Sequence, residues 1–297
     1  MSDIVLGVHL SLGRKPVESL ARASASGARA AQIFASSPGA WKAPIWQREQ
    51  AEIVWRARTD HAIDPLFIHS IYLINLASEN PDFLVRAKAS LIATLHAGSM
   101  LRAAGVITHI GSHGGRGYEQ VADQVAASLL EILAGSPGEI DLILENSAGS
   151  GGIIGSELQE LGDLLSRCGW PARLRVALDT AHLCAAGWDF RAPGTTESLI
   201  EQVHTHIGLD RLVVLHANDS KVPCGSRRDR HAVVGDGYIG LDGFRALLLQ
   251  PALRLLPWIL ETPDLGEGDP DARWVSFARL SALAAETGAL MRAHSVG

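Results

Sequence analysis

The feature that most constrains the fold is a regular alternation of short apolar runs with longer amphipathic stretches. The expected strands cover residues 4–10, 30–34, 65–70, 105–111, 141–146, 174–179, 211–219 and 257–263. Helical patterns lie between them, among them 16–27, 81–105, 118–135, 241–250 and a last one at about 270–288. Strands that are apolar along their length are typical of parallel sheets, which are buried on both faces. The alternation therefore predicts an α/β fold, a (β/α)8 TIM barrel.

The sequence indicates a single domain over residues 1–297, because no linker or change of composition divides it. A doubly wound open sheet is the alternative, but no glycine-rich dinucleotide-binding motif follows the first expected strand. Clusters of Gly, Ser and Pro follow the strand ends at 35–39, 111–117, 147–156 and 222–226. The loops at these ends build the active site of a barrel, so we expect the site at its C-terminal face.

Composition limits the class of protein further. No apolar run reaches the roughly 18 residues that a membrane span needs, and the acidic start of the chain is unlike a secretory signal. The three cysteines, Cys168, Cys184 and Cys224, fit neither a disulfide framework nor a zinc site, so we expect a cytoplasmic protein. A net charge of −6 argues against a protein that holds nucleic acid by bulk positive charge alone.

Metal-ligating side chains gather at the ends of the expected strands and in the loops that follow. They are five imidazoles and four carboxylates: His69, His109, Glu145, Asp179, His182, His216, Asp229, His231 and Glu261. Any one alone would more often be a helix cap or a supporting residue. Four carboxylates at one face require counter-charge, because burying them unpaired costs far more than a fold can offset. Divalent cations supply it, and mixed imidazole and carboxylate ligation suits Zn, Mn or Fe. The set is large enough for up to three ions, and such clusters recur in phosphoester hydrolysis.

Five strings of sequence carry a resemblance to a known family. They are HIGSH (109–113), LENSAGSG (144–151), LDTAHLCAAGWD (178–189), HANDSKVPCGSRRDRHAVVGDGYIG (216–240) and ILETP (259–263). In this order and spacing they resemble the endonuclease IV family of apurinic/apyrimidinic (AP) endonucleases. The resemblance implies a zinc enzyme of base excision repair that acts on double-stranded DNA containing abasic sites. It would hydrolyse the phosphodiester bond 5′ to the abasic site, leaving a 3′-hydroxyl and a 5′-deoxyribose phosphate. Removal of 3′-blocking groups is also expected, because the same metals would accept a terminal phosphodiester or monoester.

The resemblance also implies three Zn²⁺ ions per chain, with Mn²⁺ or Fe as an alternative at one site. The first ion would be held by His69, His109 and Glu145. Glu145 would bridge to a second ion, held also by Asp179, His216 and Glu261. The third ion would be held by His182, Asp229 and His231. Glu145 is thus the expected catalytic residue, as a bridging ligand first and as a general base second.

Contacts with DNA are expected from two loops. The segment 70–76 resembles a loop that inserts into the minor groove, with Tyr72 and Leu73 as wedge residues beside a flipped nucleotide; packing within the loop is the alternative. The basic residues expected at phosphates are Lys221, Arg227, Arg228 and Arg230; a solvated charged loop is the alternative. The first two loops depart from the family pattern at Gly13 and at Gly39–Ala40, in the region that would contact the DNA strand.

Two other histidines near the expected mouth, His9 and His113, would either support the ligands or face phosphate. The main alternative function is a metal-dependent sugar isomerase or epimerase on a similar barrel. That chemistry needs one or two ions held mostly by carboxylates and leaves a third His/Asp/His set unexplained. A binder of damaged DNA without turnover is the other alternative. We expect a monomer, because the mouth must admit bent duplex DNA.

Overall fold

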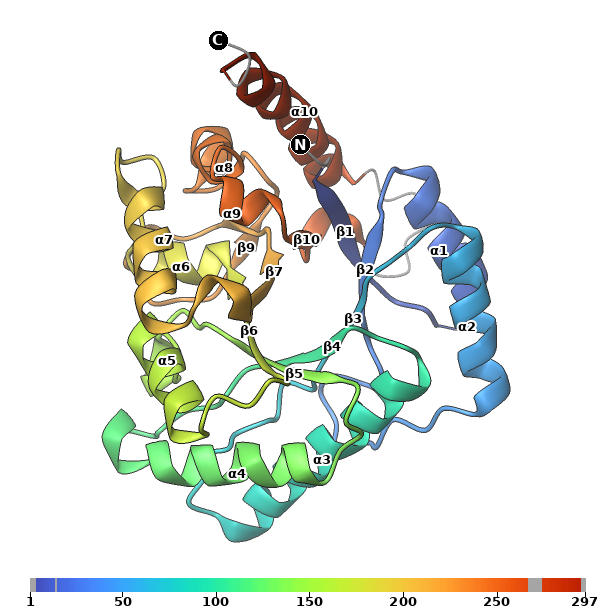
Figure 1. Ribbon diagram of the computed structural model, residues 1–297, viewed down its shortest axis with the longest axis vertical. Coiled ribbons are helices and arrows are strands. Elements are labelled where there is room, and N and C mark those ends of the chain that lie inside the picture. Colours follow the sequence, from blue (N-terminus) through green and yellow to red (C-terminus); the bar gives the residue numbers. More distant parts are fainter. Residues whose placement is uncertain (1–3, 14, 267–273, 295–297) are drawn as a thin grey trace.

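Eight parallel strands close into a barrel in the computed structural model, which describes residues 4–13, 15–266 and 274–294. Around the barrel the strands follow the order β1-β10-β7-β6-β5-β4-β3-β2. Their bounds are Val5–Leu10 (β1), Ala30–Phe34 (β2), Leu66–His69 (β3), Gly105–Thr108 (β4), Asp141–Glu145 (β5), Leu174–Asp179 (β6), Leu212–His216 (β7) and Pro257–Leu260 (β10). The predicted (β/α)8 barrel is confirmed. Figure 1 shows the strands at the centre, with the helices arranged around them.

The outer ring consists of helices whose apolar faces pack on the strands. Their bounds are Pro16–Ala25 (α1), Arg48–Asp60 (α2), Pro81–Met100 (α3), Ala122–Ala134 (α4), Leu158–Arg167 (α5), Thr180–Ala186 (α6), Thr195–His206 (α7), Gly240–Leu248 (α8), Pro251–Arg254 (α9) and Val275–His294 (α10). Local chemistry sets some of these ends. Asn80 caps α3, accepting from the backbone N–H groups of Asp82 and Phe83. Within the described residues, no helix is long and apolar enough to cross a membrane.

Several predicted bounds differ from the structure. The stretch 81–105 ends as a helix at Met100, because Arg102 adopts a left-handed φ of 52° and the chain turns into β4. The stretch 118–135 is divided into a short 3-10 turn at Tyr118–Gln120 and α4. The strand expected at 211–219 stops at His216, and Asp219–Ser220 belongs to a separate hairpin. Residues 270–273 of the last predicted helix lie outside the described residues.

The barrel interior is filled by one apolar layer, which supports everything above it. Its members come from seven strands: Ala30, Phe67, Ile107, Ile143, Ala177, Val214 and Ile259. On the eighth strand Gly7 occupies this level, where a Cβ atom would lie 2.6 Å from the Ile259 side chain, so that side chain takes the space. Because strand side chains alternate between faces, the residue two positions further along each strand points inward one level higher. That next level lies at the C-terminal face.

A buried aspartate holds the long loop after β7 in shape. Asp219 begins the two-residue strand β8 (Asp219–Ser220), which pairs antiparallel with β9 (His231–Ala232). Its carboxylate is buried and accepts backbone N–H groups from Gly235, Gly237 and Ile239 at 2.9, 3.1 and 2.9 Å. The loop that carries His231 is therefore a hairpin held by hydrogen bonds, which the sequence did not predict.

Replacing Asp219 with Ala should lower the free energy of unfolding by about 2–4 kcal/mol, because it leaves several buried N–H groups without an acceptor. Urea denaturation of the metal-loaded protein measures this. Asp236→Ala in the same loop is the matched control: its side chain is 58% exposed and pairs with Arg279, so a loss below about 1 kcal/mol is expected. Equal losses in both variants would contradict the anchoring role of Asp219.

Candidate metal centre

The site is the inward-facing level directly above the apolar layer. Two residues after each member of that layer, and after Gly7, the chain places His9, Gln32, His69, His109, Glu145, Asp179, His216 and Glu261. Six of these are predicted metal ligands, and the remaining predicted ligands come from α6 and from the β9 hairpin. The period of two in a strand thus explains why ligands spaced far apart in sequence meet at one mouth. A cavity of about 450 Å³ opens there.

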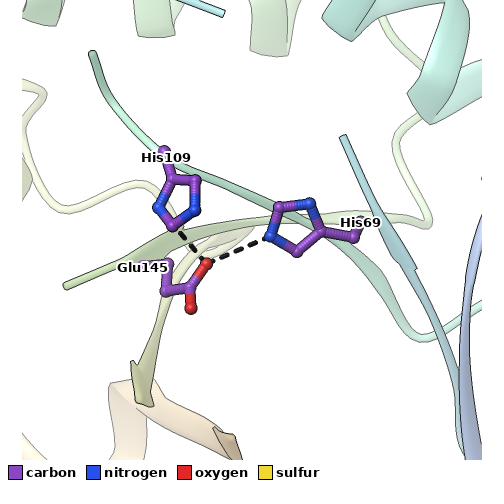
Figure 2. Close-up of side chains that lie close together, drawn as sticks. All are labelled: His69, His109 and Glu145. Carbon is purple, nitrogen blue, oxygen red and sulfur yellow. Dashed lines mark hydrogen bonds and ion pairs between the residues drawn. The ribbon is translucent and has the colours of Figure 1, made fainter. Parts of the chain in front are cut away.

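The first group of ligands surrounds one oxygen of Glu145. His69 Nε2 lies 3.2 Å and His109 Nδ1 lies 3.4 Å from Glu145 Oε2. Figure 2 shows both rings directed at this carboxylate. The ligand atoms of His69, His109 and Glu145 all lie within 4.8 Å of one another, a spacing that one ion could bridge.

A second group shares Glu145 through its other oxygen. His216 Nδ1 lies 2.8 Å from Glu145 Oε1 and 3.4 Å from Glu261 Oε2. Asp179 Oδ2 completes the group at 4.0 Å from the same nitrogen. The four ligand atoms lie within 4.8 Å of one another. Glu145 therefore contributes one oxygen to each of the first two groups.

The third group contains the residues that follow β6 and those of the β9 hairpin. His182 Nε2 lies 3.2 Å from Asp229 Oδ2, and His231 Nε2 lies 3.3 Å from Asp229 Oδ1. Asp179, His182 and His231 have ligand atoms within 4.8 Å of one another. Asp179 thus lies between the second and third groups, whereas Asp229 contacts both histidines from the solvent side, with its side chain 51% exposed.

Hydrogen bonds on the far side of the rings orient four of the five histidines. In each, one ring nitrogen faces an oxygen acceptor: Ser70 O for His69, Asn146 O for His182, Gln32 Oε1 for His216 and Glu261 O for His231, at 2.8, 3.0, 2.8 and 3.3 Å. A ring that donates one N–H in this way keeps a lone pair on its other nitrogen. This is the arrangement by which proteins fix histidine as a metal ligand.

Three buried carboxamides, which had not been predicted from the sequence, complete the frame. Asn218 donates to Asp179 Oδ2 at 2.6 Å and to Glu261 Oε2 at 3.1 Å. Asn146 Oδ1 accepts from the Asp179 backbone N–H at 2.6 Å. Gln32 contacts His216 and Glu261. Asn146 and Asn218 were visible as neighbours of ligands in sequence, and Gln32 could have been found by its inward-facing position on the second strand.

Charge in the cluster keeps Glu145 and Glu261 ionised. Burial raises the pKa of Glu145, but the facing His109 and His216 lower it more, so its pKa lies well below the usual range. The pKa of Glu261 is lowered in the same way, chiefly by His216, against the effect of burial. Burial lowers the pKa of His216 and His231, yet the surrounding carboxylates raise it to about 9 in each. Without metal, His216 and His231 carry protons that compensate the carboxylates.

The donor set fits divalent metal ions. Buried ring nitrogens His109 Nδ1 and His231 Nε2 both point into the cluster and have no hydrogen-bond partner among the described residues. Buried polar atoms left in this state mark the place of a missing partner. Imidazole nitrogens and carboxylate oxygens together are the ligands of Zn and related transition metals.

The predicted DNA-binding residues are divided between the mouth and the outer surface. Tyr72 is 63% exposed and lines the cavity beside Phe34, with ring centroids 5.3 Å apart. Leu73 is half-buried in an adjoining hollow. Arg230 lines the cavity itself. Lys221, Arg227 and Arg228 are exposed on the same loop.

The other residues considered near the mouth have clear places. His9 lies at the ligand level and lines the cavity. His113 turns into its own loop, where Nδ1 accepts from Gly115 N at 3.2 Å and Gly117 N at 3.1 Å, so its role is to shape that loop. Cys184 is buried and Cys224 is half-buried.

The fold and the site define a class of proteins, the TIM barrels with candidate metal ligands clustered at the C-terminal face. Comparisons with known proteins then show which family the chain belongs to. The family model described as "Xylose isomerase-like TIM barrel" matches residues 20–280. "Probable endonuclease 4" of Halorhodospira halophila is 37% identical over 89% of each chain, and that of Natranaerobius thermophilus is 37% identical over 88% of this chain and 92% of its own. The crystal structure of endonuclease IV from Thermus thermophilus matches with a TM-score of 0.80 and 32% identity, covering 95% of this chain and 99% of its own.

The chain belongs to the endonuclease IV family, which confirms the predicted family and enzyme class. A D-tagatose 3-epimerase-like protein also matches, with a TM-score of 0.68 and 15% identity over 99% of this chain and all of its own. At that identity the likeness shows the shared barrel alone.

Proposed function

We propose that the protein is a zinc-dependent endonuclease that hydrolyses the phosphodiester bond 5′ to abasic sites in double-stranded DNA. The products would be a 3′-hydroxyl and a 5′-deoxyribose phosphate, and the same site would remove 3′-blocking groups. The observation that carries the proposal is the convergence of eight candidate ligand side chains into three groups that share Glu145 and Asp179, with Asp229 in contact with His182 and His231. Relatives named endonuclease 4 and the matching endonuclease IV structure support the choice of substrate.

Three Zn²⁺ ions would be held by the three groups, with Mn²⁺ or Fe as an alternative at one of them. His69, His109 and Glu145 would hold the first; Glu145, Asp179, His216 and Glu261 the second; and His182, Asp229 and His231 the third. Bound divalent ions supply Lewis acidity and lower the pKa of coordinated water to about 7. A sugar isomerase needs one or two ions at carboxylate-rich sites. In such an enzyme the third set of ligands, His182, Asp229 and His231, would have no role.

The protein's own residues would arrange the substrate around this cluster. Glu145 remains ionised and places one oxygen toward His69 and the other toward His216, so it can hold two groups at a fixed spacing. Arg230 at the cavity wall would pair with a DNA phosphate. Tyr72 would occupy the space of a displaced base at the rim. Lys221, Arg227 and Arg228 would contact phosphates further along the strand.

We further propose that the chain acts as a single-domain monomer in the cytoplasm. Metal analysis, paired with incubation on a duplex oligonucleotide that contains one abasic analogue, tests the function as a whole. About three metal ions and one defined nick are expected. Bound metal with no cleavage would contradict the endonuclease and would leave a sugar isomerase or epimerase as the alternative.

Replacing Tyr72 with Ala should weaken binding of abasic duplex DNA roughly 10- to 100-fold, because an aromatic surface against the DNA is lost. The cleavage rate at saturating DNA should change little, because Tyr72 lies exposed at the rim of the cavity and belongs to none of the three metal groups. Fluorescence anisotropy and single-turnover cleavage measure the two effects. Tyr72→Phe keeps the ring and serves as the control. A loss of bound metal or of thermal stability in Tyr72→Ala would instead indicate a packing role for Tyr72.

A further inference from the structure

Two residues at the ligand level have no part in the metal groups described above. His9 and Gln32 come from β1 and β2, the two strands that supply no ligand to any of the three groups. Both are buried, with Gln32 fully so. Their contacts form one chain: the Gln32 carboxamide touches His216, Glu261 and His9.

The contacts of Gln32 fix which end of its amide faces which partner. The Gln32 nitrogen lies 2.5 Å from Glu261 Oε1. A carboxylate oxygen accepts hydrogen bonds, and the other oxygen of Glu261 already accepts one from Asn218 Nδ2 at 3.1 Å. The amide NH₂ must therefore face Glu261, and the amide oxygen must face His216 Nε2, 2.8 Å away. This oxygen accepts the His216 Nε2 hydrogen and leaves the Nδ1 lone pair for the cluster.

The same amide sets the tautomer of His9. Gln32 Nε2 lies 2.9 Å from His9 Nδ1, a normal hydrogen-bond distance, so the second amide hydrogen is donated to that nitrogen. A nitrogen that accepts this hydrogen carries none itself. The competing contact, His9 Nδ1 to Glu261 Oε1, is 3.5 Å long, which is beyond the usual range for a donated N–H. The neutral ring therefore carries its hydrogen on Nε2. This is a different outcome from that at His216, where Gln32 presents its oxygen.

The hydrogen on His9 Nε2 has no acceptor in the described part of the chain. That nitrogen is buried and has no hydrogen-bond partner among the described residues. The ring is packed against Phe34, with centroids 4.6 Å apart, and lines the same cavity as Glu145, Asp229 and Arg230. Since a protonated nitrogen offers no lone pair, His9 is not a tenth metal ligand. A buried N–H without an acceptor requires one from outside the protein.

We propose that His9 is a catalytic residue whose Nε2–H group donates a hydrogen bond to a phosphate oxygen of the DNA substrate. Gln32 is the positioning residue that fixes this tautomer of His9. The inference rests on the proposed function, because the substrate class comes from it. A phosphate oxygen suits this donor, since it carries negative charge and a charge-assisted hydrogen bond in a buried site is stronger than a neutral one. Through His216 and Glu261, Gln32 also links this donor to the second metal group.

The tautomer can be measured without any assay of activity. Long-range ¹H–¹⁵N NMR of the zinc-loaded protein labelled with ¹⁵N-histidine distinguishes a protonated nitrogen from a bare one, and His9→Asn identifies the signals of His9 by their loss. The expected result is a protonated Nε2 and a bare Nδ1 at neutral pH. A protonated Nδ1 with a bare Nε2 would overturn the proposal, because the donor would then point at Glu261.

Two substitutions of His9 test the donor itself. Asn can present an amide group near the position of Nδ1 and has nothing at Nε2, whereas Gln can place an N–H near Nε2. His9→Asn should lower kcat on abasic duplex roughly 10- to 100-fold, with KM and bound zinc unchanged. His9→Gln should recover a part of kcat. His204→Asn, on the exposed face of α7, is the matched control and should behave as the wild type.

Gln32→Leu separates the positioning role from the donor. It should lower kcat at least as far as His9→Asn, and should also weaken zinc retention against a chelator roughly 10- to 100-fold, because the hydrogen bonds that orient His216 and Glu261 are lost. Wild-type kcat in His9→Asn, or loss of zinc in His9→Asn equal to that in Gln32→Leu, would overturn the proposal. If the wild type itself leaves abasic duplex intact, the proposed function fails, and the NMR result still decides the tautomer.

Discussion

Glu145→Gln is expected to lower the rate of cleavage at an abasic site by roughly 1000-fold or more, equivalent to about 4 kcal/mol of transition-state stabilisation. The carboxylate offers one oxygen to His69 and His109 and the other to His216, so two metal groups depend on it. The isosteric amide keeps the shape, but it removes the negative charge and turns one of the two oxygens into an N–H donor. Single-turnover cleavage of a labelled abasic duplex measures the effect.

Glu157→Gln is the matched control for this experiment, because Glu157 is exposed at the start of α5 and should tolerate the same change. Circular dichroism should show the same fold for both variants. Metal analysis should show fewer bound ions in Glu145→Gln alone. Cleavage by Glu145→Gln within tenfold of wild type, with its metal retained, would contradict the bridging role of this carboxylate.

Removal of metal should abolish cleavage and lower Tm by about 5–10 °C, and this decrease in Tm should be larger at high pH. In the metal-free protein the pKa of His216 and of His231 is raised from the ordinary 6.5 to about 9. A histidine whose pKa is raised by folding contributes its full stabilisation below its pKa in the unfolded chain, about 6.5. That stabilisation is lost as the pH rises through 9, because the histidines lose the protons that compensate the carboxylates. Metal binding also displaces these protons, so metal affinity rises over the same range.

Differential scanning calorimetry of chelated and zinc-loaded protein at pH 6 and pH 8.5 tests this dependence. The difference in Tm between the two forms should be larger at pH 8.5. Activity should return when zinc is added to the chelated protein. A difference in Tm that is the same at both pH values, or larger at pH 6, would show that His216 and His231 do not carry the compensating protons.

The strand ends show which features of the fold and the site could be predicted from the sequence. The apolar runs predicted eight strands, and the ligand types at their ends predicted a shared mouth, because a period of two fixes the direction of side chains along each strand. Helix ends were less certain, as at Met100, where a single left-handed residue stops α3. The hairpin of β8 and β9 was missed, since two-residue strands leave no periodicity to detect. The resemblance to the endonuclease IV family assigned the ligands to groups, which periodicity alone could not do.

The sequence by itself determined the barrel, the family and the nine candidate ligands, because these follow from local patterns and residue types. Only the tertiary structure decided how the ligands are held. Gln32, Asn146 and Asn218 carry no charge and no motif of their own, yet their amides orient His216, Asp179 and Glu261. The hydrogen-bond direction of an amide depends on which partners surround it. Those partners come from strands up to 229 residues apart, as Gln32 and Glu261 do, and only the closed barrel brings them together.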